Sequence, residues 1–235
     1  MEVVHTLLSL GASLLSFVFA AAVFRRYAAR PTRKHLLVWG IALVFYGIGT
    51  ACEVVTSVWG FHPLVLKVWY LFGAILVAAW LGQGTIFLLA PDRWVRLTTV
   101  LLIAASLFAA WAVAVAEVDL YYYTMSMELS GRAFTTTWVR MITPFFNIYG
   151  TVALVGGALY SAWLFWLKRV WPYRMLGNLL IATGALAPAI GGTLSRLGLP
   201  GLYVGEFIGV CLMYLGFVLA TASTTGSLVH AVAES

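Results

Sequence analysis

Residues 97–116 read LTTVLLIAASLFAAWAVAVA, a run without a single charged side chain. As an α-helix this run is about 30 Å long, which matches the hydrocarbon core of a bilayer. A strand of a membrane barrel would alternate apolar and polar residues over about 10 positions, whereas this run is apolar on every side. The stretch therefore predicts a helix that crosses a membrane.

The rest of the chain repeats this pattern. Of its 235 residues, 63% are hydrophobic and 9% are charged, too few charges to cover a water-soluble particle. We read the first apolar run as a retained helix and not as a secretory signal, because Glu2 precedes it and Arg25 and Arg26 follow it. The prediction is an all-α integral membrane protein, a single seven-helix transmembrane domain over residues 1–235. Its helices are expected at 3–24, 36–59, 64–89, 97–116, 141–167, 175–196 and 202–224.

Basic residues are divided unevenly between the two ends of these helices. Ten lie in the first, third and fifth loops: Arg25, Arg26, Arg30, Arg33, Lys34, Arg93, Arg96, Lys168, Arg169 and Arg174. Four lie at the other end: Lys67, Arg132, Arg140 and Arg196. The positive-inside rule predicts cytoplasmic first, third and fifth loops, with the N-terminus outside and the C-terminus inside. We expect a multi-pass protein of the bacterial inner (plasma) membrane, whose net charge of +6 serves topology and contact with membrane lipids, and no nucleic-acid partner.

One long loop and one internal sequence similarity lead to two further predictions. Residues 117–140 contain two β-prone runs, 120–125 and 133–138, so we expect an outer β-hairpin, either resting at the lipid interface or acting as a lid. Residues 46–63 loosely echo 188–200, which is compatible with a 3+1+3 pseudo-repeat of helices.

Polar residues inside the predicted membrane are the best pointer to function. Glu53 and Glu206 each lie about six residues, or about 9 Å, below the outer end of a helix. A carboxyl group at that depth must face protein or water and needs a partner. The predicted ligand-binding residues gather around them in the outer half: Glu53, Glu206, Lys67, Arg196, Tyr46, Thr50, Tyr70, Arg140 and Asn147.

Three explanations of the two carboxylates stay open. They could line a ligand or ion pocket, pair with Lys67 and Arg196 to fix helix register, or snorkel to the lipid edge. No catalytic group, metal site or cofactor is expected, because the four histidines are scattered and no nucleophile motif is present. Residues 202–224 contain no lysine for a retinal Schiff base. Whether the chain is an enzyme is uncertain, and we lean against it.

The run from Trp39 and Gly40 to Glu53, followed by Trp69-Tyr70-Leu71-Phe72-Gly73, resembles the seven-helix membrane sensor region of some bacterial histidine kinases. The resemblance covers the second and third helices only, and no kinase follows the seventh helix in this sequence. It implies a membrane-embedded sensor whose output is supplied by another protein.

The first functional hypothesis is a polytopic inner-membrane receptor or binding module, with an extracytoplasmic polar pocket for a small ligand, ion or lipid headgroup. A small-solute or ion transporter is the alternative, and water reaching Gln83, Asn178 and Thr183 in the inner half would favour it. An accessory subunit of a larger membrane complex is the third. A protein partner would bind through Gly205 and Gly209, a G-x-x-x-G pair, or through Trp-rich faces.

Overall fold

The structure is a computed structural model that describes residues 2–121, 129–168, 172–197 and 201–233. Seven helical segments are long and apolar enough to cross a membrane. They are Val3–Ala29, Lys34–Trp59, Pro63–Leu89, Asp92–Val115, Thr137–Leu167, Tyr173–Ser195 and Leu202–Thr221. The prediction of an all-α chain with seven such helices is confirmed, and the chain is a multi-pass membrane protein.

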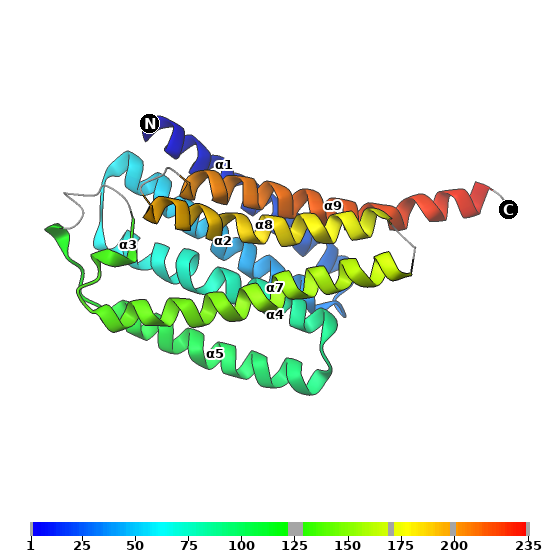
Figure 1. Cartoon of the computed structure of the whole chain (residues 1–235), viewed down its shortest axis with the longest axis horizontal. Helices are drawn as coiled ribbons and strands as arrows, with labels where there is room; N and C mark the ends of the chain where they lie inside the picture. The colour runs from blue at the N-terminus through cyan, green and yellow to red at the C-terminus, as the bar shows by residue number, and fades with distance from the viewer. Residues whose placement is uncertain (1, 122–128, 169–171, 198–200, 234–235) are drawn as a thin grey trace. The chain divides into compact units, whose positions relative to one another are not determined.

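The chain divides into two compact units, Met1–Leu154 and Val155–Ser235. The first unit contains α1 (Glu2–Ala29), α2 (Lys34–Trp59), α3 (Pro63–Trp69), η1 (Tyr70–Leu76), α4 (Val77–Leu89), α5 (Asp92–Val115), η2 (Gly131–Ala133) and η3 (Thr137–Met141). Helix α7 (Ile142–Leu167) belongs to both units, and the second unit adds α8 (Pro172–Arg196) and α9 (Leu202–Ala233) (Figure 1). Because one helix is shared by the units, the single domain over residues 1–235 stays a prediction.

Several helices extend beyond the predicted apolar runs. Helix α1 continues to Ala29 through Arg25 and Arg26, since arginine is a good helix former and the helix can project out of the hydrocarbon. It ends at Ala29, because Pro31 disfavours helical backbone at Arg30, the residue before it. Helix α5 begins five residues earlier than predicted, at Asp92, whose carboxylate complements the positive end of the helix dipole.

The turn between α2 and α3 is built by local chemistry. Gly60 has φ of 86°, which favours glycine, and its N–H donates to Thr56 O at 2.9 Å to close the end of α2. Pro63 occupies the first turn of α3, where its missing N–H costs nothing. His62 Nδ1 accepts a hydrogen bond from Leu64 N at 3.2 Å and caps this helix.

The third membrane span is not a regular α-helix. Seven residues in its middle, η1, form a π-helix between α3 and α4. Runs of π-helix are rare and are frequently found at functional sites. The apolar side of this span packs with α5 in a buried cluster that includes Leu66, Ile75 and Ala112. A π segment thus sits inside the best-packed part of the first unit.

The segment between α5 and α7 folds onto that same cluster. Val118 and Phe134 form one antiparallel bridge, in which Asp119 N donates to Ala133 O at 2.7 Å. Phe134 is only 2% exposed, and its ring centroid lies 4.9 Å from that of Tyr70. The second run of the expected β-hairpin, 133–138, forms no strand. It contains one bridge residue, Phe134, between two 3-10 turns. The tip, 122–128, lies outside the described residues.

In the second unit, α8 and α9 pack through glycines. A Cβ atom added at Gly205 would lie 2.6 Å from Ala187 O, and one at Gly184 would lie 2.7 Å from Gly209 O. Such close backbone approach is a common way for membrane helices to associate. The surface of Gly205 and Gly209 is therefore occupied by α8, and Pro188 lies inside α8 beside Gly209.

Candidate functional site

Glu53 lies in α2 with only 6% of its surface exposed. Its two carboxylate oxygens accept hydrogen bonds from two other helices. Ser9 Oγ of α1 donates to Oε2 at 2.7 Å, and Trp69 Nε1 of α3 donates to Oε1 at 3.0 Å. We call these three residues the Glu53 centre. The carboxylate that the sequence placed in the outer half thus joins α1, α2 and α3.

The Glu53 centre is the middle of a polar track between α1 and α2. On one side of it the hydroxyl groups of Thr6 and Ser57 hydrogen bond to each other, and on the other Ser13 Oγ donates to Gly47 O at 3.0 Å. Hydrogen bonds between helices in a membrane contribute about 0.6 kcal/mol each on average. The track fixes how α2 is rotated against α1, and it directs Glu53 toward α1.

Tyr46 and Thr50 share this part of α2 and are both buried. The Thr50 hydroxyl donates to Tyr46 O at 3.1 Å and lies 3.3 Å from Gly47 O. A hydroxyl that donates to its own helix keeps acceptor capacity for a second partner. The Thr50 hydroxyl can therefore accept a hydrogen bond from a ligand, but its own proton is already donated to Tyr46 O.

Lys67 does not pair with Glu53 in the described part of the chain. Its ammonium donates instead to the backbone oxygen of Ala114 at 2.7 Å. Ala114 is in the last turn of α5, where carbonyl groups lack partners within the helix and the dipole favours a cation. In this structure Lys67 caps α5, so the register-fixing pair with Glu53, one of the three explanations that the sequence leaves open, is not the contact that Lys67 makes.

The remaining predicted residues of the first unit are more spread out. Tyr70 is buried at the start of η1, and its hydroxyl accepts a hydrogen bond from Thr143 Oγ1 of α7 at 2.8 Å. Asn147 is half-buried on α7, one turn further along. Arg140 is exposed in η3. Tyr70 adjoins the Glu53 centre through its neighbour Trp69, whereas no hydrogen bond among the described residues joins Arg140 or Asn147 to that centre.

Glu206 and Arg196 belong to the second unit. Glu206 is half-buried in α9, with its Oε2 atom buried. Arg196 ends α8, and its side chain lies outside the described part of the structure.

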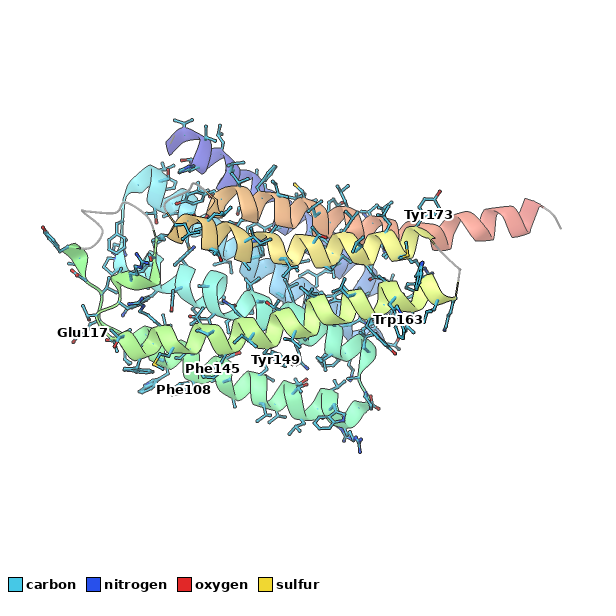
Figure 2. All side chains as sticks on the ribbon, in the orientation of Figure 1. Phe108, Glu117, Phe145, Tyr149, Trp163 and Tyr173 are labelled. Atoms are coloured by element: carbon cyan, nitrogen blue, oxygen red, sulfur yellow. The ribbon has the colours of Figure 1, made fainter. Side chains whose placement is uncertain are left out.

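A second polar cluster joins α4, α5 and α7 within the first unit. Gln83 of α4 is 0% exposed, and its amide nitrogen donates to Thr98 Oγ1 at 3.1 Å and Thr99 Oγ1 at 2.9 Å. Its amide oxygen accepts from the hydroxyl of Tyr149, which Figure 2 labels on α7. Both threonine hydroxyls donate to carbonyl groups of their own helix, so they are free to accept from Gln83. We call this set the Gln83 cluster.

Sequence reasoning found Gln83 but missed its partners. Thr98 and Thr99 lie in a largely apolar helix. A threonine whose hydroxyl donates to its own helix is common in such a helix, so the sequence does not indicate that it has a second partner. A signal was nevertheless present for two of them, because Gln83 and the Thr98-Thr99 pair lie at similar distances from the loop that joins their spans. Among the described residues, no three His, Cys, Asp or Glu side chains lie close enough together to hold a metal ion.

In comparisons with known protein families, curated proteins and solved structures, no match to this chain was found.

Proposed function

We propose that this chain is a receptor or binding module of the bacterial inner membrane, and that its Glu53 centre takes up a small ligand, ion or lipid headgroup from the extracytoplasmic side. One observation carries the proposal. Glu53 is a carboxylate buried within a membrane helix, and it is bonded to Ser9 and Trp69 from two further helices. Ionisable groups inside membrane spans are costly, and they mark ligand or ion sites by default.

The depth of Glu53 favours access from one side. It lies six residues before Trp59, the last residue of α2, which corresponds to about 9 Å along the helix. The excess of basic residues at the opposite end of α2 favours the assignment of the Glu53 end to the outside. A carboxylate has about four acceptor sites, so one that accepts from the neutral donors Ser9 and Trp69 can also bind a cation, a protonated amine or a hydroxyl group.

The Gln83 cluster favours a binding module over a transporter. A translocation path would need polar groups or water in the inner half of the bundle, and Gln83 is the obvious candidate. Its amide hydrogens and oxygen are already bonded to Thr98, Thr99 and Tyr149, and it is fully buried. The hypothesis of two rocking three-helix halves receives no support from this arrangement.

The π-helix offers a route for a signal. Trp69 donates to Glu53 and directly precedes η1, while Tyr70 at the start of η1 is bonded to Thr143 of α7. A ligand that draws Glu53 away from Trp69 would release the N-terminal end of this irregular segment. Movement there would reach α7 through Tyr70, which is compatible with the sensor resemblance and with output by a partner protein.

A thermal-shift screen of the purified protein in lipid nanodiscs tests the proposal. The probes are sodium, calcium, ethanolamine, choline and glycerol phosphate. A probe at 100 times its dissociation constant stabilises a protein by about 2.7 kcal/mol, which raises Tm by roughly 5 °C or more for a chain of this size. At least one probe is expected to do so for the wild type and not for Glu53→Gln.

Glu117→Gln is the matched control, because it makes the same change at an exposed position at the same end of the first unit (Figure 2). It should keep the response of the wild type. A response that survives Glu53→Gln, or that Glu117→Gln abolishes equally, would remove the Glu53 centre from the binding site.

A further inference from the structure

The end of the first unit opposite the Glu53 centre carries a dense set of cations. Five exposed basic residues fall within ten positions at the turn from α1 to α2: Arg25, Arg26, Arg30, Arg33 and Lys34. The turn itself is ordered by backbone hydrogen bonds, in which Arg30 N donates to Tyr27 O at 2.9 Å and Arg33 N donates to Arg30 O at 3.1 Å. The cations are therefore presented by a structured turn, which lowers the entropy lost when they bind.

A second group lies beside them at the turn from α4 to α5. Arg93 and Arg96 are both exposed, and the Arg93 guanidinium lies 5.8 Å from the ring centroid of Trp94. Helices α2 and α4, which adjoin these two turns, pack against each other, and Trp39 Nε1 donates to Leu81 O at 3.0 Å. Figure 1 shows both turns at the same end of the first unit. We call the seven basic residues of the two turns the basic end.

Few acidic residues accompany the basic residues of these two turns in the sequence. Residues 25–35 contain no carboxylate, and residues 90–96 contain only Asp92. Guanidinium groups bind phosphate oxygens through paired N–H donors, which an ammonium group does not offer. Six of the seven cations are arginines with exposed side chains. Tyr27 and Trp94 add aromatic rings of the kind that sit at headgroup depth.

We infer that the basic end is a binding site for the phosphodiester headgroup of an anionic phospholipid from the leaflet that surrounds it. Each turn presents exposed guanidinium groups at this end of the first unit, and Tyr27 and Trp94 directly follow arginines in the chain. This site is separate from the Glu53 centre and does not depend on the proposed receptor function. It also goes beyond the positive-inside rule, which needs the charges only during insertion.

Binding of phosphatidylglycerol to the detergent-purified protein, measured by native mass spectrometry against phosphatidylcholine, tests the inference. Arg30→Gln/Arg33→Gln is expected to weaken phosphatidylglycerol binding by roughly 10- to 30-fold, since each basic residue contributes about fivefold near an anionic surface. Arg132→Gln/Arg140→Gln removes the same charge from exposed arginines at the other end and should leave binding unchanged. Equal binding by wild type and Arg30→Gln/Arg33→Gln, or equal loss in the control, would overturn the site.

Two measurements on the wild type keep the inference testable if the double variant inserts incorrectly. Phosphatidylglycerol binding should weaken when NaCl is raised from about 0.05 to about 0.5 M, because exposed charges are screened. Binding that does not depend on salt would overturn the inference. Inorganic phosphate at millimolar concentration should not displace the lipid, and displacement would identify free phosphate, and not a lipid, as the ligand.

Discussion

The Glu53 carboxylate is the acceptor for two hydrogen bonds from other helices. Replacement with Leu removes the acceptor for Ser9 and Trp69 while keeping apolar bulk, and it should lower the free energy of unfolding by about 1–3 kcal/mol, since both donors are left inside the protein. Glu53→Gln keeps an acceptor oxygen and should cost less than about 1 kcal/mol. Unfolding in bicelles followed by circular dichroism measures both. A Gln variant that fails to fold would make Glu53 a purely structural residue.

Lys67 has a different role from the one its charge suggests. Lys67→Met keeps the apolar stem but removes the donor to Ala114 O, so the unfolding free energy should fall by about 0.5–2 kcal/mol. Lys67→Arg should recover part of the loss, and ligand binding at the Glu53 centre should be unaffected. If Lys67→Met abolishes binding with no loss of stability, Lys67 belongs to the site and not to the cap of α5.

These two residues show what a sequence can and cannot predict about a site. The depth of Glu53 follows from counting residues to the end of an apolar run. Its partners do not follow, because they depend on how α1 and α3 are rotated about their axes. The partner of Lys67 is a backbone carbonyl, which has no signature in the sequence, so the sequence offers a carboxylate as one possible partner and cannot indicate the carbonyl.

At the scale of helices, α4 and α7 approach each other through backbone. A Cβ atom added at Gly150 would lie 2.1 Å from the carbonyl carbon of Ala78. Gly150→Ala should therefore destabilise the first unit by about 1–3 kcal/mol through overpacking. Gly156→Ala is the control on the same helix, because a Cβ there meets no atom within 4 Å, and it should be neutral or stabilising. Equal thermal midpoints for the two variants would contradict this packing.

The Gln83 cluster should act as a structural joint between α4, α5 and α7. Gln83→Leu is expected to cost about 1–3 kcal/mol because the Tyr149 hydroxyl loses its acceptor. Tyr149→Phe removes that hydroxyl, so the double variant should be less destabilised than the sum of the single ones. Unfolding measurements on the three variants check this. Additive losses would show that the two side chains are not coupled.

Hydrophobic run length was enough to predict the existence of every membrane span, because a bilayer imposes a minimum length on an apolar helix. The predicted ends of the helices were less accurate. Arg25, Arg26 and Asp92 are helical because charged residues can continue a helix into the headgroup region. The π-helix at Tyr70–Leu76 could not be predicted, since its residues are as apolar as those of the α-helical turns on either side.

At the scale of the whole molecule, orientation is the first property to establish. Single cysteines replacing Arg132 or Arg30, in a background with Cys52 and Cys211 changed to Ala, report the side on which each loop lies. A membrane-impermeant maleimide should label the Arg132→Cys variant in intact cells and the Arg30→Cys variant only after lysis, because positive loops stay inside. The reverse pattern would place the Glu53 centre near the cytoplasm and contradict an outward-facing site.

The most direct test of the central claim is a cryo-EM structure of the protein in lipid nanodiscs, determined with and without the probe that gives the largest thermal shift. The account predicts density within hydrogen-bond distance of the Glu53 carboxylate in the presence of the probe, together with a changed Trp69 contact. A carboxylate that stays enclosed by Ser9 and Trp69 in both structures, with no density beside it, would contradict the claim that Glu53 is the binding centre.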